Sequence, residues 1–182
     1  MRLAALWTTV FLTIAGSAAA ADIWRLFQFE EDGFAIDFPQ IPVITNQALI
    51  GDSRIRTDEY YVGIGSYTFM VTAVLFPYVS REQIGSDESL LRRLIDIFVA
   101  NCAIHDERPI LIRGAAAREI HAENCEKGAT TTARYYFVDD WLYQIVVVGP
   151  KGMVSSRETQ HFMESFRLTA KRCIYNSAQH CH

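Results

Sequence analysis

The stretch TTTARYYFVDDWLYQIVVVG, residues 130–149, decides the fold. It contains two runs rich in β-branched and aromatic side chains, and Asp139 and Asp140 separate them. Such runs are typical of strands, and a two-residue polar connection is typical of a hairpin between antiparallel strands. The pattern predicts that this hairpin lies near the centre of a sheet. We interpret the two aspartates as its turn, because Asp tolerates turn geometry, although paired carboxylates also occur in catalytic sites.

Further strand patterns precede this hairpin. WRLFQFEEDGFAIDFPQIP, residues 24–42, predicts two short strands around a turn at residues 31–33, and another strand follows near residues 43–49. RIRTDEYYVGIGSYTFMVTAVLFP, residues 54–77, predicts a hairpin with two glycines in its turn. Alternate residues of its second arm are apolar, which predicts a strand with one buried face. RPILIRG and AAREIHAENC, within residues 108–125, predict the last two strands before residue 130.

Two segments have helical periodicity. Residues 87–101 follow a possible cap at Ser86 or Asp87. The apolar positions of this segment are spaced to form one stripe: Leu90, Leu91, Leu94, Ile97 and Phe98. Residues 155–166 predict a final helix capped by Ser155 or Ser156, with a buried stripe of Phe162, Met163 and Phe166. Strands joined by short turns, followed by helices, indicate an α+β fold in which an antiparallel sheet packs against helices.

Three segments resemble the PsbP-like fold group. They are GFAIDFP at residues 33–39, LYQIVVVG at 142–149 and SFRL at 165–168. The resemblance implies a PsbP-like α/β sandwich and a role as a non-enzymatic accessory or assembly protein, as in the extrinsic subunit of the photosynthetic oxygen-evolving complex. It implies no ligand, because no family site motif matches a position of this sequence.

The first 21 residues are organised as a secretory signal peptide. Arg2 precedes an apolar run, and small residues with an Ala-x-Ala pattern end it at residues 18–20. Cleavage there leaves residues 22–168 as a single α+β domain without a membrane span, followed by a C-terminal tail at 169–182. The alternative is a retained anchor, because residues 3–21 are uncharged and approach the length of a bilayer span.

Charge disfavours a nucleic-acid partner. Removing Arg2 from the 17 basic residues leaves 16 against 21 acidic residues, a formal charge of −5, and the two signs are interspersed. Proteins that bind nucleic acid usually carry a basic patch instead. Because the chain is predicted to be exported as an accessory module, we expect its partner to be a protein of the cell envelope.

Four cysteines follow the signal-like segment, and an even number in an oxidising compartment suggests disulfides. If residues 102–125 fold as a hairpin turning at Arg113 and Gly114, residues whose numbers add to 227 lie opposite each other. Cys102 then faces Cys125, at a separation suited to a disulfide, and Arg108 faces Glu119. We predict that Cys102 and Cys125 form one bridge.

The tail ends in KRCIYNSAQHCH, residues 171–182, which combines possible metal ligands with two cysteines. His180, Cys181 and His182 are consecutive, so in an extended segment Cys181 points away from both histidines. Cys173 and Cys181 enclose enough chain to close a small loop. We predict a disulfide-stapled tail; a metal site and an unpaired tail are the alternatives.

No motif predicts a catalytic, cofactor-binding or metal-binding residue. The segment GIGSY at residues 63–67 lacks the last glycine of a nucleophile elbow, and the sequence contains neither a phosphate-binding loop nor His-Glu-x-x-His. One group of residues around the hairpin between the cysteines could form an acid–base or metal cluster, or only a solvated face: His105, Asp106, Glu107, Glu119, His121 and Glu123.

Two smaller features complete the candidates. Arg54, Arg56, Tyr60 and Tyr61 could form an exposed basic and aromatic patch, or pair across strands. His161, beside Phe162 on the last predicted helix, is expected at the surface or at the edge of the core.

An exported, periplasmic, non-enzymatic accessory or binding module is the function that this sequence favours, without a cofactor. A small hydrolase or metal-dependent enzyme with a site that no motif reveals is one alternative, and an envelope metal-binding protein is another.

Overall fold

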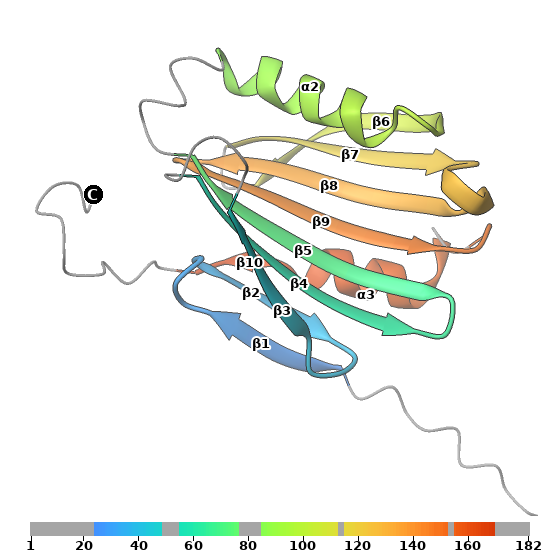
Figure 1. Cartoon of the computed structure of the whole chain (residues 1–182), viewed down its shortest axis with the longest axis horizontal. Helices are drawn as coiled ribbons and strands as arrows, with labels where there is room; N and C mark the ends of the chain where they lie inside the picture. The colour runs from blue at the N-terminus through green and yellow to red at the C-terminus, as the bar shows by residue number, and fades with distance from the viewer. Residues whose placement is uncertain (1–23, 49–54, 77–84, 113–114, 153–154, 170–182) are drawn as a thin grey trace, which may run out of the picture.

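The computed structural model describes residues 24–48, 55–76, 85–112, 115–152 and 155–169. The hairpin of residues 130–149 forms β8 (Thr130–Val138) and β9 (Trp141–Gly149), joined by Asp139 and Asp140. β9 is the middle strand of a seven-stranded antiparallel sheet with the order β3-β4-β5-β9-β8-β7-β6 (Figure 1). The predicted central hairpin and the α+β class are confirmed.

The other strands of this sheet are two further hairpins, β4–β5 and β6–β7, and the edge strand β3. The sheet is completed by β3 (Val43–Ala48), β4 (Arg56–Ile64), β5 (Tyr67–Leu75), β6 (Ala103–Ile112) and β7 (Ala115–Glu123). A second, three-stranded sheet of order β1-β2-β10 contains β1 (Arg25–Phe29), β2 (Phe34–Phe38) and β10 (Arg167–Leu168). β10, near the end of the described chain, therefore pairs with β2, near its beginning.

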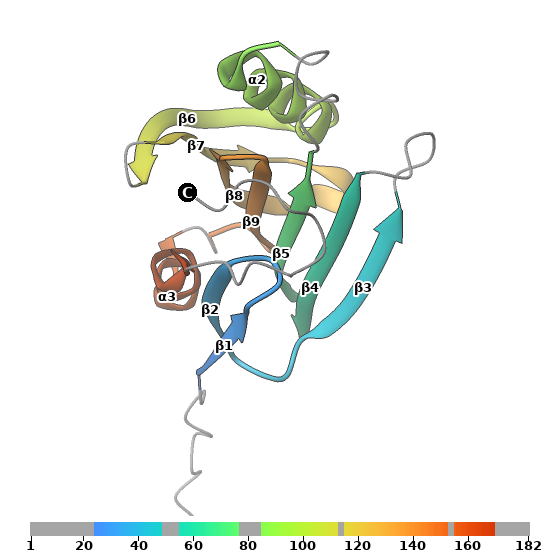
Figure 2. The same ribbon diagram turned by 90° about the vertical axis from the view of Figure 1, so that its left-hand side faces the viewer.

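Both faces of the large sheet are covered, as the two orthogonal views show (Figures 1 and 2). α2 (Asp87–Phe98) packs on one face, and α3 (Arg157–Ser165) lies with β1 and β2 on the other. β9 shows this by alternation, because Trp141, Tyr143 and Ile145 join the core under α3 while Leu142 and Val146 join the core under α2. Continuous apolar runs such as β9 are typical of strands that are buried on both faces.

The second arm of the 54–77 hairpin is β5, and the prediction that only one of its faces is buried is wrong. Phe69, Val71 and Ala73 of β5 face the core on the α3 side, as the alternation indicated. Thr72, between Val71 and Ala73, and Val74, after Ala73, are also buried, and Val74 belongs to the core on the α2 side of the sheet. Alternation identified the more apolar face but not the second one.

Both helices begin at serine caps. The side chain of Ser86 accepts a hydrogen bond from the backbone N–H of Ser89 (3.2 Å) before α2. Ser156 accepts one from Thr159 (3.1 Å) before α3. Such caps satisfy N–H groups that have no partner inside the helix.

One position of the predicted α2 stripe is wrong. Ile97 is 70% exposed, whereas Ile95 is buried with Leu90 and Leu91. An i, i+4 step from Leu91 reaches Ile95, so the buried face continues through that residue and leaves Ile97 on the outer side.

The β6–β7 hairpin confirms the predicted register over most of its length. Arg108 lies opposite Glu119, and Asp106 lies opposite His121, as the sum of 227 requires. A register shift between Ile104 and Asp106 moves the pairing by one, so that Ala103 lies opposite Glu123. The bulge does not prevent the disulfide, because Cys102 and Cys125 are bonded with their Cα atoms 4.1 Å apart.

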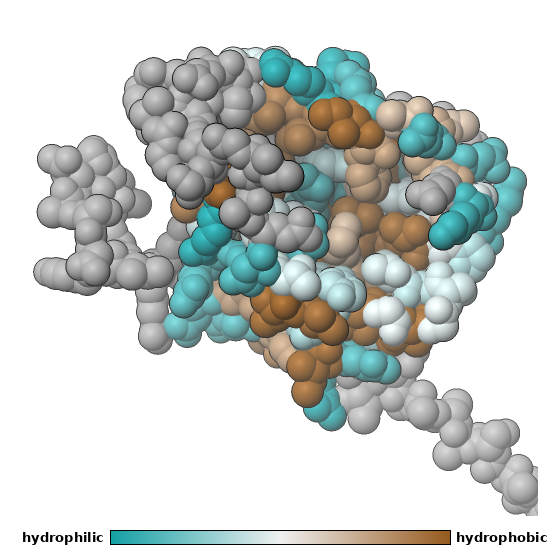
Figure 3. All heavy atoms as spheres, in the orientation of Figure 1, coloured by the Kyte–Doolittle hydropathy of each residue, from teal (hydrophilic) through white to brown (hydrophobic). Residues whose placement is uncertain are grey.

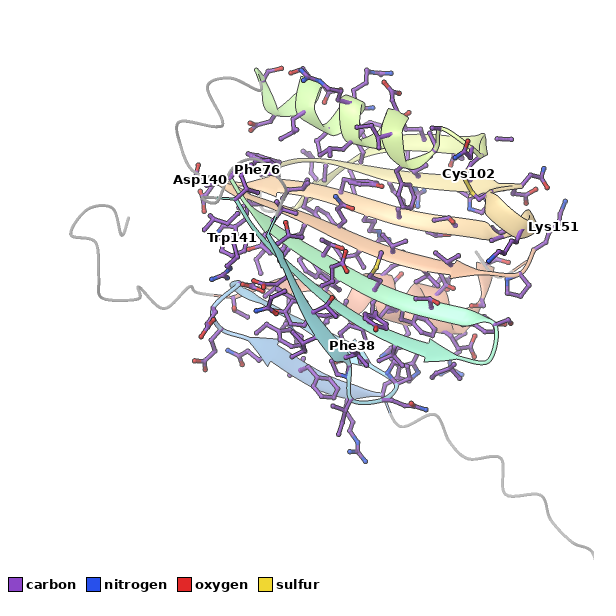
Figure 4. All side chains as sticks on the ribbon, viewed as in Figure 1. Phe38, Phe76, Cys102, Asp140, Trp141 and Lys151 are labelled. Atoms are coloured by element: carbon purple, nitrogen blue, oxygen red, sulfur yellow. A yellow bond between two sulfur atoms is a disulfide. The ribbon has the colours of Figure 1, made fainter. Side chains whose placement is uncertain are left out.

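The sheet has distinct features at its two ends. Phe76, Asp140 and Trp141 lie at one end, where the N–H of Phe76 donates to the carbonyl of Asp140 (2.8 Å), and Cys102 and Lys151 lie at the other (Figure 4). Asp139 adopts a left-handed backbone with φ of 55°, which agrees with its predicted place in the turn. In the described part of the chain, no helix is long and apolar enough to cross a membrane.

Candidate functional site

A polar groove of about 340 Å³ lies between α3 and the β6–β7–β8 part of the sheet. The strands contribute alternate residues, which therefore point to the same face. The groove is lined by Asp106, Arg108, Glu119, His121, Thr132 and Arg134 from the strands and by Thr159, Gln160, Met163 and Glu164 from α3. α3 covers the middle of the sheet, so the face of β6 and β7 beside it stays open and polar.

Glu119 is the centre of this groove. Arg108 donates to it through Nε (2.8 Å) and Nη2, and Arg134 donates to its other carboxylate oxygen. Arg134 also donates to the carbonyl of Met163 (2.8 Å), which connects β8 to α3. The Arg–Glu–Arg arrangement therefore joins three strands and fixes the position of the helix that forms the other wall.

The electrostatics of this network keep Glu119 ionised. Burial opposes the charged form, but the hydrogen bonds and charges of Arg134 and Arg108 outweigh it and lower the pKa of Glu119. A carboxylate held in this way cannot supply a proton near neutral pH, and both of its oxygens already accept hydrogen bonds. Glu119 thus has a positioning role in the groove.

The predicted histidine and carboxylate cluster is assembled only in part. Asp106, Glu119 and His121 line the groove together. His121 lies opposite Asp106 in the hairpin, and its Nδ1 atom is 3.5 Å from the hydroxyl oxygen of Thr132. This distance is longer than that of an ordinary hydrogen bond to a hydroxyl group.

The other members of that cluster lie elsewhere. Glu107 is on the opposite face of β6 and pairs with Arg118 (3.2 Å), which also contacts Glu88 of α2. Glu123 pairs with Lys151 (3.3 Å) at the end of the sheet. The side chain of His105 is outside the described part of the structure. Within the described residues, no three His, Cys, Asp or Glu side chains are grouped so that they could hold a metal ion.

The predicted basic and aromatic patch contributes to a buried cluster instead. Arg56 and Tyr60 both donate to the carboxylate of Asp32, which is only 1% exposed. The hydroxyl of Tyr143 donates to the backbone carbonyl of Asp32 (2.6 Å), and the Arg56 guanidinium lies 5.1 Å from the centre of the Trp141 ring. These contacts hold the turn between β1 and β2 against the large sheet.

Burial is the main influence on Asp32. It raises the pKa of this carboxyl group, although the hydrogen bond from Tyr60 and the charge of Arg56 partly offset the rise. Burial, followed by the hydrogen bond to Asp32, likewise raises the pKa of Tyr60, so its hydroxyl remains a donor. Of the four predicted patch residues, Arg56 and Tyr60 belong to this cluster; their partner Asp32 was not predicted, although the acidic turn at residues 30–32 was a signal for it.

His161 is exposed at the edge of the core, as predicted. Its Nε2 atom lies 3.0 Å from the carboxylate of Asp37 in β2, and its ring contacts Trp24 with the ring centres 4.7 Å apart. These contacts connect α3 to the strands below it.

The free edge of β3 is an apolar surface. Among the described residues, β3 pairs with β4 on one side and with no strand on the other. Val43 and Ile44 of this strand are more than half exposed, and so are Ile41 before it and Leu26 of β1. Figure 3 shows apolar surface on the lower part of the molecule, where β1 and β3 lie.

Several predicted features lie outside the described residues. They are the signal-like segment at 1–21, Arg54, and the part of the tail that follows Thr169, which includes Cys173 and Cys181. The stapled tail therefore stays a prediction.

Solved structures show what this fold is similar to. The solution structure of cyanobacterial PsbP (CyanoP) from Synechocystis sp. PCC 6803 matches with a TM-score of 0.57 and 8% identity, over 83% of this chain and 95% of that chain. A Pseudomonas aeruginosa protein of unknown function, PA94, described as a putative regulator, matches with a TM-score of 0.42 and 13% identity, over 75% of this chain and 90% of that one. No protein-family model and no curated protein matches the sequence. The chain thus has a PsbP-like fold, as the sequence resemblance predicted.

Proposed function

We propose that this protein is an exported, non-enzymatic accessory module that binds a protein of the cell envelope by pairing an extended segment of that protein with the free edge of β3. An unpaired edge strand presents backbone N–H and C=O groups that another chain can complete. In a strand of six residues, about half of the residues direct these groups outward. Exposed apolar side chains would then give the pairing its specificity.

The contrast between the two edges of the large sheet carries this proposal. β6 has the features that discourage pairing with other chains, because it contains the bulge near residue 105, the charged residues 106–108 and Pro109. β3 is VITNQA, without a charge or a proline, and it exposes two consecutive β-branched side chains. One edge is thus protected against association, and the other is not.

Two observations support export. The N-terminal segment has the pattern of a secretory signal peptide. Cys102 and Cys125 are bonded, and such bonds persist mainly in oxidising compartments. The PsbP-like fold group, in which accessory proteins are common, supports a role without catalysis.

The alternative of a small hydrolase rests on the groove. Asp106, His121 and Thr132 lie on neighbouring strands, in the order that a carboxylate, a base and a hydroxyl nucleophile would require. The 3.5 Å separation of Thr132 and His121 and the engagement of Glu119 by two arginines favour binding over catalysis. Loss of a measured hydrolytic activity in His121→Ala, with folding intact, would support the enzyme instead.

Matched substitutions on the two edges test the proposal. Ile44 in β3 and Leu111 in β6 are exposed apolar residues, 54% and 78% respectively. Each is changed to lysine in the intact protein, which is then crosslinked in the native envelope, purified and examined by mass spectrometry. We expect Ile44→Lys to lose a partner that Leu111→Lys retains, with both variants within about 0.5 kcal/mol of the wild type in stability. Equal recovery of that partner by both variants would contradict a role for β3.

A further inference from the structure

A small aromatic pocket lies beside the first turn of α3 and shares no lining residue with the groove or with β3. Its volume is about 250 Å³. This is slightly below the roughly 300–1,000 Å³ of pockets that take drug-sized ligands, so it suits a single chemical group. The pocket is lined by Trp24, Pro39, Ile64, Tyr67, Phe69 and Glu158.

The aromatic rings form the walls of a corner. The rings of Trp24 and Phe69 are nearly perpendicular, at 88°, with their centres 5.4 Å apart. Tyr67 lies next to Phe69, because these two rings are stacked, parallel within 7° and with their centres 6.4 Å apart. Ring faces carry partial negative charge, so a corner of this kind attracts a cation.

The walls are fixed by packing behind them. Trp24 contacts the rings of His161 and Phe162 in α3, with centre separations of 4.7 and 6.4 Å. Phe69 also packs edge to face on Phe162, at 5.3 Å. The corner is therefore formed before any ligand enters, which reduces the entropy lost on binding.

Charge and polarity define the ligand. Glu158 is the single charged residue among those that line the pocket, and it is exposed, with no hydrogen-bond or ion-pair partner among the described residues. A carboxylate in the first turn of a helix is stabilised by the helix dipole. Pro39 and Ile64 add apolar surface, which disfavours a strongly hydrated ion. A cation with an alkyl surface satisfies both requirements.

We infer that this pocket binds a quaternary ammonium group, with its methyl groups against the rings of Trp24, Tyr67 and Phe69 and its charge near Glu158. Such a group occurs on small free molecules such as choline and on the headgroup of phosphatidylcholine. Binding here is independent of the β3 edge, so this inference does not depend on the proposed function.

The test follows the indole N–H resonance of Trp24 by NMR. The protein is produced with its own leader and purified after processing, and it is titrated with choline. The neutral analogue 3,3-dimethyl-1-butanol has nearly the same shape and serves as the ligand control. We expect a saturable shift with choline and affinity at least about tenfold weaker for the neutral analogue, because the attraction depends on charge. Equal affinity for both compounds, or no saturable shift, would overturn the inference.

Variants identify the groups that bind. We expect Tyr67→Leu and Glu158→Gln each to weaken choline binding about five- to tenfold, and Tyr67→Phe to retain it because the ring remains. Tyr61→Leu and Asp96→Asn are matched changes outside the pocket and should leave the affinity unchanged. Retained affinity in both Tyr67→Leu and Glu158→Gln would place the binding site elsewhere.

Two further arms identify the source of the cation. Flotation with phosphatidylcholine vesicles but not with phosphatidylglycerol vesicles would indicate a lipid headgroup, and choline binding without flotation would indicate a small free molecule. Both results support the pocket. Acetylation removes the charge of the N-terminal ammonium group. If choline bound only after the mature N-terminus had been acetylated, the chain's own N-terminal ammonium group would be the occupant of the pocket, and an external ligand would be refuted.

Discussion

Reduction of the Cys102–Cys125 disulfide should destabilise the fold by about 3.4 kcal/mol. The bridge joins residues with a sequence separation of 23. For a loop of this length, the chain-entropy relation gives about 3.4 kcal/mol at room temperature, because reduction releases the unfolded chain from the closed loop. A domain of ordinary stability has roughly 5–15 kcal/mol in total, so the loss is large.

The effect should also be local. Cys102 lies shortly after the end of α2, and its N–H donates to the carbonyl of Val99, the C-cap residue of that helix (2.8 Å). Cys125 is at the end of the β7 hairpin, where its N–H donates to the carbonyl of Ala129 (3.0 Å). The bridge therefore fixes the end of α2 to the neighbouring β7–β8 connection. We expect faster hydrogen exchange in α2 and β6 after reduction, and little change in β9, which is buried on both faces.

The assay is urea unfolding of oxidised and reduced protein. A variant with serine at both tail cysteines, residues 173 and 181, is used in both states, so that reduction acts on one bridge only. With a slope of roughly 2 kcal/mol/M, the midpoint should fall by about 1.7 M urea. A shift below about 0.5 M, or recovery of Cys102 and Cys125 as free thiols from the unreduced protein, would refute the reasoning.

Three other predictions concern charged groups and the tail. Glu119→Gln should destabilise the fold by about 2 kcal/mol, because Arg134 loses a partly buried partner. Since folding lowers the pKa of Glu119, the stabilisation by its carboxylate is present above the unfolded pKa near 4.5 and is lost as pH falls through the folded pKa. Urea unfolding of the wild type should show this loss of stability in acid, and the variant should not. Asp32→Ala should cost about 2 kcal/mol of stability, because the buried hydroxyl of Tyr60 loses its acceptor. Since folding raises the pKa of Asp32, the difference in stability between wild type and variant should be largest in acid and should narrow as pH rises through the folded pKa. A difference that widens as pH rises would contradict this prediction. Non-reducing peptide mapping should recover Cys173 joined to Cys181, whereas stoichiometric zinc binding in calorimetry that disappears on deletion of residues 173–182 would show a metal site instead.

Local pattern was sufficient to predict the strands of the large sheet and the helix caps. The runs on either side of Asp139 and Asp140 pair through a two-residue turn, and their β-branched and aromatic content indicated a place near the sheet centre. The Cys102–Cys125 bridge followed from hairpin register, and it survived a one-residue bulge because a disulfide can form from neighbouring as well as from directly opposed positions.

Contacts between distant segments could not be predicted in the same way. β10 joins β2 across more than a hundred residues, and no local pattern specifies that pairing. Arg134 donates to the carbonyl of Met163 because α3 packs on the sheet, and the sequence does not specify where that helix lies. A useful signal was present, however, because Arg134 is a lone charge within an apolar strand, and such a charge requires a partner when the strand is buried.

The double cover of the sheet limits where this protein can bind anything. Because β9 is buried on both faces, its side chains serve packing, and accessible chemistry is left to the periphery. Three peripheral features in the described part of the chain use different residues: the β3 edge, the groove around Glu119 and the aromatic corner at Trp24. The first is uncharged, the second is internally ion-paired, and the third has one carboxylate, Glu158, without a partner among the described residues. Substitutions at one of them should therefore leave the other two intact, so a protein partner, a groove ligand and an ammonium ligand can be distinguished by separate variants of the same folded chain.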